Sequence, residues 1–532
     1  MQPREIILPS GRRYTYEYDS YDGLTSIRLP GSGGIFTIEL QTGFFGRVRF
    51  SQKLPGIDGP YVTYWNGDGQ LLQIRPPTVG FGGISVFQYS NDGKLKSAVS
   101  GSSHTQFVYH PKGWLNQVDH ETDFFSLKLT EVHQTLETNG NCLRERRLTF
   151  DSKSGFAAAK FLYEYRSSLY LFSISGRIGG QALPSHFIRN SHSLILPNDG
   201  LIKDIGQFYI HVHNLNETTI SDGVATFARS ESTESLHVSG RELYRAHSDT
   251  DGCGRLQTVQ FAVVRAESES NKVVKYKYDE DGQLEVATID STEYRYAYDD
   301  NGNLLSSDFT SSSTVSTDRN SFEYTVNNQI SRQKGQRFFY EYDTLGRVVV
   351  DRHKNRLVYE IGDRLSTVDV SGEKGLRVTY YYDFLGRLCG RKDTAENSTQ
   401  YFYAFPDRPY LVSHVYNSRA GRLTTLVYDN QNRLIFADVD QRRYYVVSDR
   451  IGSPNLFITP TGKIVREINR TPFGYVVSDS ERTLEVPIGF AGGIYDQVLE
   501  IIHIQVKHIF ATFIFLFQLI FYRHIFNHYH FR

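Results

Sequence analysis

The sequence predicts an all-β fold in which short antiparallel hairpins repeat along most of the chain. The chain has 532 residues and contains 36 Tyr and 35 Phe, and aromatic side chains favour half-buried strands over helices that are rich in Leu and Ala. A short phrase also recurs, written YEYDTLGRV from Tyr340 to Val348 and YYYDFLGRL from Tyr380 to Leu388. Aromatic residues, a turn signal and an aliphatic residue in this order are typical of a β-hairpin.

Further copies of this phrase follow one another at a ragged period of roughly twenty residues, in which two strands and two turns fit. A propeller is the alternative, but its blades need about 40 residues with regular spacing. The two weak copies at Tyr324 and Tyr359 favour the shorter unit. The anchoring residues of the copies are Tyr89, Tyr109, Tyr278, Tyr298, Tyr342, Tyr382 and Tyr428 in the clear cases, and Tyr324 and Tyr359 in the weak ones.

Each position of the phrase has a structural reason. Tyr340 and Tyr342 lie two residues apart, so both point to one face of a strand. The Asp that follows can bond the backbone two residues on, and the Gly accepts a positive φ, so the pair predicts a turn. No hairpin buries its aromatic face alone, so neighbours must form a long sheet that curls, closes or spirals. The predicted turn residues are Asp279, Gly282, Asp299, Gly302, Asp343, Gly346, Asp383 and Gly386.

Residues 1–500 are predicted to form one repeat region, and 501–532 a hydrophobic aromatic tail. The repeats between residues 120 and 270 are less regular and are interpreted as degenerate copies. Ser306-Ser307 and the serines at 311–313 predict a hairpin loop rather than a linker.

Composition excludes several kinds of partner and site. Lys and Arg number 58 against 59 Asp and Glu, so nothing favours nucleic acid or an anionic membrane surface. The three cysteines, Cys142, Cys253 and Cys389, are odd in number and far apart, so they predict neither a disulfide framework nor a metal site. The N-terminal residues lack the apolar core of a secretory signal.

The repeated carboxylates, including Asp429, invite a hydrolase hypothesis, but their fixed place before Gly favours turn capping. The sequence contains no G-x-S-x-G or H-E-x-x-H motif. We therefore expect neither an enzyme nor a cofactor. Four arginines that follow the turns could bind glycans or an anionic partner, or could pair with Asp and stack on Tyr, which is the interpretation we favour. They are Arg347, Arg364, Arg387 and Arg433.

Histidines suggest a metal site at two places. His211 and His213 share one face of a strand, which is a geometry that can bind zinc, although an ordinary sheet surface explains them. The tail histidines lack a set of carboxylates or cysteines around them, so we predict no metal there. These histidines are His503, His508, His524, His528 and His530.

Two features concern the location of the chain. Asn216, Asn397 and Asn469 begin N-x-S/T sequences, which are glycosylated only outside the cell. The apolar core of the tail, from Ile509 to Tyr522, is shorter than the roughly 20 residues that span a bilayer. A membrane segment, a strand-like plug and a read-through of the gene model all remain open for this tail.

The phrase Y-x-Y-D-x-x-G-R resembles the YD repeat of teneurins and of bacterial Rhs and toxin-complex shell proteins. Motifs at about 440–496 resemble the Rhs-associated core, in the order D-x-x-G-S-P, x-x-G-x-x-V, P-F-G and G-F-x-G-x-x-x-D. Two motifs resemble the teneurin branch in particular, F-P-D-R-P from Phe405 to Pro409 and G-F-A-G-G-I-Y-D from Gly489 to Asp496.

This resemblance implies a large hollow barrel or shell, built from a spiralling β ribbon. It would be incomplete at the C-terminus here, because the family pattern gives way to the tail after Asp496. The self-cleaving Asp motif of the bacterial relatives is not found, so proteolysis is not carried over. Exposed sheet edges also predict that the isolated chain is unstable.

For function, the resemblance implies a non-enzymatic fragment of a cell-adhesion and signalling receptor on the outer side of the plasma membrane, in neuronal recognition. Its partners would be a second teneurin or a latrophilin-type adhesion receptor, and it would be held at the membrane by the parent protein or by the tail. The alternative is a shell of the Rhs or toxin-complex kind that encloses a C-terminal toxin.

Overall fold

A computed structural model gives the structure of the chain. The described residues are 3–31, 34–42, 47–53, 57, 59–77, 83–135, 141–166, 170–187, 194–196, 200–205, 208–214, 217–311, 314–325, 329–333, 340–360, 364–372, 375–504 and 507–510. They form antiparallel strands and a 3₁₀ turn, η2 (Phe490–Gly492). The predicted all-β fold of antiparallel hairpins is confirmed.

The chain forms two compact units, each made of segments that are far apart in sequence. Among the described residues, unit 1 comprises 3–104 and 274–377, and unit 2 comprises 105–273 and 378–510. The predicted boundary at residue 500 stays a prediction. Three strands contain the boundaries between the units, namely β10 (Ser103–Tyr109), β25 (Glu269–Tyr278) and β35 (Arg377–Tyr382).

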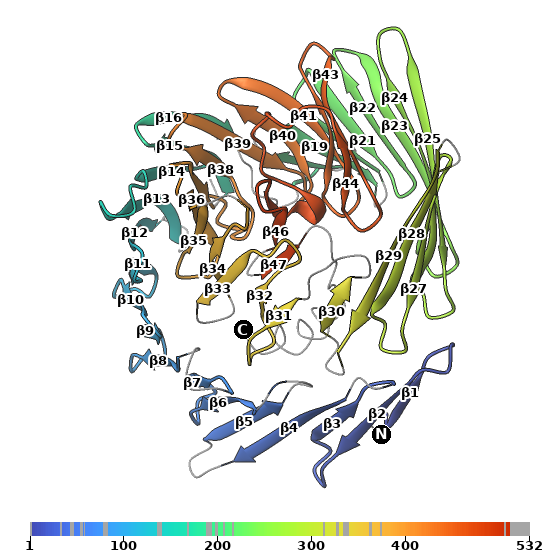
Figure 1. Ribbon diagram of the computed structural model, residues 1–532. Coiled ribbons are helices and arrows are strands. Elements are labelled where there is room, and N and C mark those ends of the chain that lie inside the picture. The colour runs from blue at the N-terminus through green and yellow to red at the C-terminus, as the bar shows by residue number, and fades with distance from the viewer. Residues whose placement is uncertain are drawn as a thin grey trace. The chain divides into compact units, whose positions relative to one another are not determined.

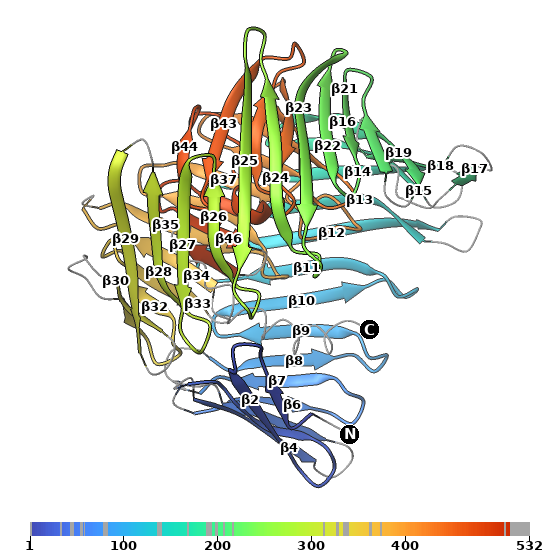
Figure 2. The same ribbon diagram turned by 90° about the vertical axis from the view of Figure 1, so that its right-hand side faces the viewer.

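In unit 1, strands that follow one another within a sheet are antiparallel neighbours in chain order, as Figure 2 shows for β6 (Tyr61–Trp65) to β9 (Leu95–Ser100). One sheet ends at β30 (Ile330–Gln333), and the next begins at β31 (Glu341–Tyr342). The first segment contains β1 (Glu5–Ile7), β2 (Arg13–Tyr18), β3 (Leu24–Arg28), β4 (Ile35–Thr42), β5 (Val48–Lys53), β6 (Tyr61–Trp65), β7 (Leu71–Arg75), β8 (Ser85–Tyr89) and β9 (Leu95–Ser100). The second contains β26 (Leu284–Ile289), β27 (Thr292–Tyr298), β28 (Leu304–Ser311), β29 (Thr314–Tyr324), β30 (Ile330–Gln333), β31 (Glu341–Tyr342), β32 (Val348–Val350), β33 (Arg356–Glu360) and β34 (Arg364–Asp369).

The strands of unit 1 alternate as the sequence predicts. Ile27 of β3 lies opposite Phe36 of β4, and Leu40 of β4 lies opposite Phe50 of β5. Residues that are directly opposite share a face of the sheet, so these four side chains form one apolar face. Glu39, between Phe36 and Leu40 in register, points to the other face.

A polar contact joins the two segments of unit 1. Arg12, in the turn between β1 and β2, places Nε 2.7 Å from Oδ2 of Asp281, and Ser10 donates its backbone N–H to Oδ1 of Asp281 at 3.0 Å. Burial alone would raise the pKa of Asp281, but the Ser10 hydrogen bonds and the charge of Arg12 outweigh it and hold that pKa below its ordinary value. A repeat turn is therefore tied to the start of the chain.

Unit 2 contains most of the remaining strands (Figure 1). Its first segment holds β11 (Leu115–Glu121), β12 (Ser126–Thr135), β13 (Asn141–Phe150), β14 (Ala159–Arg166), β15 (Tyr170–Ile178), β16 (Gln181–Phe187), β17 (Leu194–Leu196), β18 (Gly200–Ile205), β19 (Phe208–Asn214), β20 (Glu217–Ser221), β21 (Ala225–Arg229), β22 (Thr233–Val238), β23 (Arg241–Thr250) and β24 (Leu256–Val264). Its second segment holds β36 (Leu388–Asp393), β37 (Ser398–Phe402), β38 (His414–Asn417), β39 (Arg422–Tyr428), β40 (Leu434–Val439), β41 (Arg442–Ser448), β42 (Pro454–Ile458), β43 (Ile464–Arg470), β44 (Val476–Asp479), β45 (Ile494–Asp496), β46 (Ile501–Ile504) and β47 (Lys507–Phe510).

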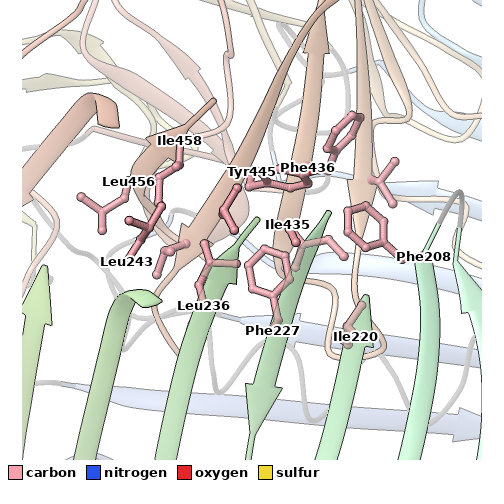
Figure 3. Packing of buried hydrophobic residues seen from close by; sticks show 14 of the residues in the cluster. Phe208, Ile220, Phe227, Leu236, Leu243, Ile435, Phe436, Tyr445, Leu456 and Ile458 are labelled. Carbon is pink, nitrogen blue, oxygen red and sulfur yellow. The ribbon is translucent and has the colours of Figure 1, made fainter. Parts of the chain in front are cut away.

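The core of unit 2 forms where its two segments face each other. Figure 3 shows Phe208 and Phe227 from the first segment against Phe436 and Tyr445 from the second. The ring centroids of Phe208 and Phe436 are 5.8 Å apart, nearly edge to face. Each buried side chain of this size contributes about 1.5–3 kcal/mol, so this packing holds the later repeats against the earlier strands.

One loop prediction is wrong. Ser306 and Ser307 lie inside β28, where they pair with Ser321 and Asn320 of β29. Ser and Thr hydroxyls are tolerated in an antiparallel pair, so local composition alone did not mark the strand. Ser311, also part of the predicted loop, is the last residue of β28, and Ser312 and Ser313 lie outside the described residues.

The sheets are open in their strand order. No pairing among the described strands joins the first strand of a sheet to its last. The hairpin architecture is thus as predicted, without hydrogen-bonded closure of any one sheet into a barrel.

Candidate functional site

The repeated Asp-x-x-Gly turn has the same geometry at each predicted copy. In the turn that begins at Asp343, its Oδ1 accepts the backbone N–H groups of Leu345 and Arg347, both at 2.9 Å. Gly346 donates its N–H to the Asp343 carbonyl at 3.0 Å and has φ +76°, which favours Gly. The same pattern places Asp279 with Gly282 (φ +84°), Asp299 with Gly302 (φ +82°) and Asp383 with Gly386 (φ +75°).

At several repeats a Tyr near the turn reaches back to the repeat before it. Tyr342 donates its phenol O–H to the carbonyl of Ile330, the aliphatic residue that follows the preceding turn, at 2.8 Å. Burial raises the pKa of Tyr342, so the phenol keeps the proton that it donates. We call this hydrogen bond the anchor bond. It recurs from Tyr89 to Leu71, Tyr298 to Leu284, Tyr324 to Leu304 and Tyr359 to Val348 in unit 1, and from Tyr403 to Leu388 in unit 2.

The arginine after the turn pairs with the turn Asp and stacks on a Tyr ring. Arg347 donates Nε to Oδ2 of Asp343 at 2.7 Å, and its guanidinium lies 4.9 Å from the ring centroid of Tyr359. Arg387 makes the same pair with Asp383 at 2.7 Å and lies 4.4 Å from the ring centroid of Tyr403. These arginines thus pair and stack, as favoured above. Arg433 pairs with Asp429 at 3.2 Å, and Arg364 begins β34.

Two anchors escape the sequence pattern because they are not Tyr. Ser448 donates Oγ to the carbonyl of Leu434 at 2.7 Å, and Arg470 donates Nη1 to the carbonyl of Pro454 at 2.6 Å. A β-bulge precedes each of them, as it precedes Tyr342. The spacing of Asp449 to Gly452 after Ser448 is the signal that could have identified this anchor. The motifs of the core-like segment therefore continue the same repeat.

Three of these later motifs meet at η2, within unit 2. Ser453 accepts the backbone N–H of Ala491 at Oγ, at 3.0 Å. Gly474, of P-F-G, lies under the ring of Phe490, so that a Cβ added there would be 2.5 Å from the ring. A Cβ added to Gly452 would lie 3.6 Å from the backbone nitrogen of Gly492. The Phe490 ring therefore leaves no room for a side chain at Gly474, whereas the contact at Gly452 is an ordinary van der Waals distance and its φ of +94° is what favours Gly there.

The final Asp of G-F-x-G-x-x-x-D enters a buried cluster. Oδ2 of Asp496 accepts the phenol of Tyr380 at 2.6 Å and Nε of Arg391 at 2.8 Å, and Arg391 also pairs with Asp393 at 2.9 Å. Burial alone would raise the pKa of Asp496, but the charge of Arg391 and these hydrogen bonds hold it below its ordinary value. The ring of His503 lies 4.6 Å from that of Tyr380. We call Tyr380, Arg391, Asp496 and His503 the Asp496 cluster.

A second buried ionic network joins the two segments of unit 2. Asp429, which has no exposed side-chain surface, accepts from Arg229 and from Arg433. Arg433 also donates Nη1 to Glu234 at 2.5 Å. Since breaking a buried pair leaves an uncompensated charge, these groups fix how the later strands sit on β21 and β22. The sequence pattern marks Asp429 as a turn residue only, and it does not indicate the partner Arg229.

The predicted glycosylation sites have different surroundings. Asn469, on β43, donates Nδ2 to Oγ of Ser478 at 2.9 Å and is half-buried. Asn397 donates Nδ2 to Oδ2 of Asp393 at 3.0 Å and lies in a turn. Asn216 lies outside the described residues. Glycosylation at these positions stays a prediction.

Other singled-out residues are dispersed. The rings of His211 and His213 on β19 are 4.3 Å apart. In the part of the chain that the structure describes, no group of three or more His, Cys, Asp or Glu is placed to hold a metal ion. Cys142 and Cys389 are buried and Cys253 is exposed, all as free thiols. His508 lies on β47, where its register partner on β46 is His503. His524, His528 and His530 lie outside the described residues.

No described helix is both long enough and apolar enough to cross a bilayer. Of the tail predicted for 501–532, the structure describes only β46 and β47. The rest of the tail lies outside the described residues. Chemically, the repeat turns, the anchor bonds and the two ionic networks engage most of their polar side chains with one another or with the backbone, which suits a scaffold.

Comparisons with known proteins identify what this arrangement is similar to. A family model described as Teneurin YD-shell matches residues 1–517. The chain is 27% identical over 516 residues to Teneurin-m of Drosophila melanogaster and 26% identical over 519 residues to Teneurin-1 of Gallus gallus. Each match covers 94% of this chain but only 18% of the relative, so the chain spans less than a fifth of the length of these proteins.

Solved structures are similar in fold. A structure of TcdB2-TccC3 without its hypervariable C-terminal region matches with a TM-score of 0.53 and 12% identity, and covers 94% of this chain and 29% of that one. A structure of TcdB2-TccC3 matches with a TM-score of 0.50 and 12% identity, over 94% of this chain and 33% of that one. At this identity the likeness shows the fold alone.

Proposed function

Because the chain belongs to the teneurin YD-shell family, we propose that it is part of a cell-adhesion receptor that acts outside the cell in neuronal recognition and signalling. In this proposal it is a non-enzymatic, glycosylated recognition scaffold at the plasma membrane. Its partners are a second teneurin or a latrophilin-type adhesion receptor. The family match across residues 1–517 is the observation that carries the proposal.

The geometry supports a scaffold role rather than chemistry at the repeats. The Asp and Arg side chains that could form a site, such as Asp343 with Arg347 and Asp383 with Arg387, bond to each other and to the turn backbone. Tyr hydroxyls are engaged in anchor bonds. Partner recognition is therefore assigned to outward side chains, since the repeated polar groups are already used in holding the fold.

The test is to display the 532-residue chain, through a fused membrane anchor, on suspension cells that lack teneurins and latrophilins. The proposal expects either aggregation of the displaying cells or binding of a soluble latrophilin ectodomain. Protease resistance of the displayed chain serves as the folding control. Display of a protease-resistant chain that does neither would contradict the proposal.

The alternative function is a shell that encloses a toxin, which the likeness to the TcdB2-TccC3 structures favours. It makes a different prediction. A small protein fused after Arg532 would be protected from protease until the chain is unfolded, whereas the adhesion proposal expects the fused protein to be digested at the rate of the free protein.

A further inference from the structure

Tyr21 has an exposed fraction of 92%, the largest among the exposed large hydrophobic side chains of the described residues. It lies in the turn between β2 and β3, where Oδ1 of Asp19 accepts the backbone N–H groups of Tyr21 and Gly23, both at 2.8 Å. Leu345, at the corresponding place of the Asp343 turn, is buried at 7% exposure. The backbone of the Tyr21 turn is therefore held in place, while the phenol lies in water.

The turn is also acidic. Glu17, Asp19 and Asp22 flank Tyr21, and residues 14–27 contain no Lys or Arg. The enzymes of the secretory pathway that transfer sulfate to tyrosine select acidic segments, because attraction between opposite charges brings such segments into a basic cleft. Tyr21 thus has the charge surroundings of a sulfate acceptor.

The sequence alone does not choose between Tyr21 and Tyr18, since Tyr18 has Glu17 and Asp19 directly on either side. The structure does distinguish them. Tyr18, the last residue of β2, is half-buried and donates its phenol O–H to the carbonyl of Pro3 at 3.0 Å. An acceptor tyrosine must enter the cleft of the enzyme with its oxygen able to react, so Tyr18 would first have to leave its strand. Tyr21 needs no such opening.

We propose that Tyr21 is a tyrosine sulfation site. The proposal rests on the proposed extracellular function, because proteins meet the sulfate donor on the secretory route. In the reaction the phenol oxygen of Tyr21 attacks the sulfur of an activated sulfate nucleotide. An oxygen–sulfur bond forms, the bond from sulfur to the phosphate oxygen of the nucleotide breaks, and the phenol proton passes to a base of the transferase. The nucleotide leaves with its phosphate, and nothing is oxidised or reduced.

The product adds a fixed negative charge to a turn that already carries Asp19 and Asp22. The fold can accept this charge because the sulfate would be hydrated rather than buried. The modified turn would attract a partner that has a basic surface, as other charge-adding modifications do.

The test is sulfation in vitro of the folded 532-residue chain by a tyrosine sulfotransferase of the secretory pathway and its activated sulfate nucleotide, with circular dichroism as the check of folding. A synthetic peptide of residues 14–28 is the unfolded reference. Trypsin releases the same segment from the chain by cleaving after Arg13 and Arg28, and fragmentation in the mass spectrometer locates the sulfuryl group. The peptide should be modified at both Tyr18 and Tyr21. The folded chain should be modified at Tyr21 in preference to Tyr18 by at least about tenfold, because Tyr18 reacts only after local opening.

An unmodified folded chain, or equal modification of Tyr18 and Tyr21 in it, would overturn the proposal. Tyr475 is an internal control that should stay unmodified, since it is 48% exposed but has no acidic residue within three positions. The assay needs no adhesion partner, so its failure and a failure of the binding test for the proposed function are separate results.

Variants separate the roles of exposure and charge. Tyr18→Phe should leave sulfation of the folded chain unchanged, and Tyr21→Phe should abolish it. Asp19→Asn combined with Asp22→Asn removes two charges but keeps the side-chain oxygen that the turn uses, and Asn tolerates the φ of +60° at position 22. Sulfation of this double variant should be largely lost. Undiminished sulfation of the folded double variant would overturn the acidic recognition on which the proposal depends.

Discussion

At the residue scale, the repeat consists of a few side chains that each satisfy one specific need of the backbone. The Asp carboxylate collects the N–H groups of its turn, and the Gly adopts a positive φ. The Tyr hydroxyl supplies a donor to a carbonyl of the preceding repeat. Buried backbone N–H groups and carbonyls require hydrogen-bond partners. The phrase recurs along the sequence because similar hairpins leave the same backbone groups in need of a partner.

The anchor bond predicts a measurable contribution from a single oxygen. Tyr403→Phe removes the 2.7 Å bond to the buried carbonyl of Leu388 and keeps the ring under Arg387. We expect the free energy of unfolding to fall by about 2 kcal/mol, because the carbonyl loses its donor. Urea unfolding measures this.

The control for the anchor bond is Tyr475→Phe. Tyr475 is 48% exposed, so its hydroxyl stays in water and the change should remain within about 0.5 kcal/mol. Equal effects of the two substitutions would contradict the role of the anchor bond.

Residue roles could be predicted where they depend on local spacing. The Asp and Gly of the turns follow from the preference of the turn itself, and the pairing of Arg347 with Asp343 is a contact within one repeat. The anchors Ser448 and Arg470 could not be predicted by searching for Tyr, since any side-chain donor of sufficient reach satisfies the carbonyl. Tyr403 was missed because its turn differs from the repeat pattern.

At the element scale, small residues decide how the later motifs pack. Two constraints favour Gly at position 474. Its φ is +88°, and the ring of Phe490 occupies the space that a Cβ would need. The motifs P-F-G and G-F-x-G, which are separate in sequence, thereby form one packed junction around η2. No sequence pattern gives this contact, because it depends on how β43, β44 and η2 are brought together.

Gly474→Ala is predicted to lower the free energy of unfolding by more than the strain of its positive φ alone would. The control is Gly180→Ala, which has a similar φ of +85° and no atom within 4 Å of the added Cβ. The control should lose about 1 kcal/mol through strain alone. Gly474→Ala should lose about 2 kcal/mol more, because the Phe490 ring must move. Thermal unfolding compares the two, and an equal loss would show that the ring contact has no energetic weight.

The Asp496 cluster predicts a pH-dependent loss. Asp496→Asn removes one of the two carboxylates that pair with the buried Arg391 and leaves Asp393 as the other, so the free energy of unfolding at pH 7 should fall by about 3 kcal/mol. The folded pKa of Asp496 is lowered, so the stabilisation by its charge is complete above the ordinary pKa of about 3.9 and is lost as the pH falls through the folded value. The gap between the two proteins should therefore narrow below pH 3.9.

An exposed pair provides the control for this variant. Asp369 accepts from Arg377 at 2.5 Å, but both side chains are well exposed. Asp369→Asn should cost at most about 1 kcal/mol at pH 7, as surface ion pairs do. Denaturant unfolding at pH 7 and at pH 3 measures both variants, and a negligible effect of Asp496→Asn at pH 7 would refute the importance of the cluster.

At the scale of the whole molecule, the all-β class and the hairpin unit follow from composition and repetition. The division into two units does not, because each unit joins segments that are distant in sequence. The ionic network of Arg229, Asp429 and Arg433 shows why: its partners are separated by the intervening strands. Local pattern specifies the hairpins, whereas the pairing of distant segments depends on packing that only the structure gives.

In the proposed function the repeats form the scaffold, and outward side chains recognise the partner. The most direct measurement is binding of a soluble latrophilin ectodomain, and of a second copy of the chain, to the immobilised 532-residue chain by surface plasmon resonance. Circular dichroism with a cooperative thermal transition establishes that the sample is folded. We expect saturable binding of at least one of these partners. A folded chain that binds neither would contradict it.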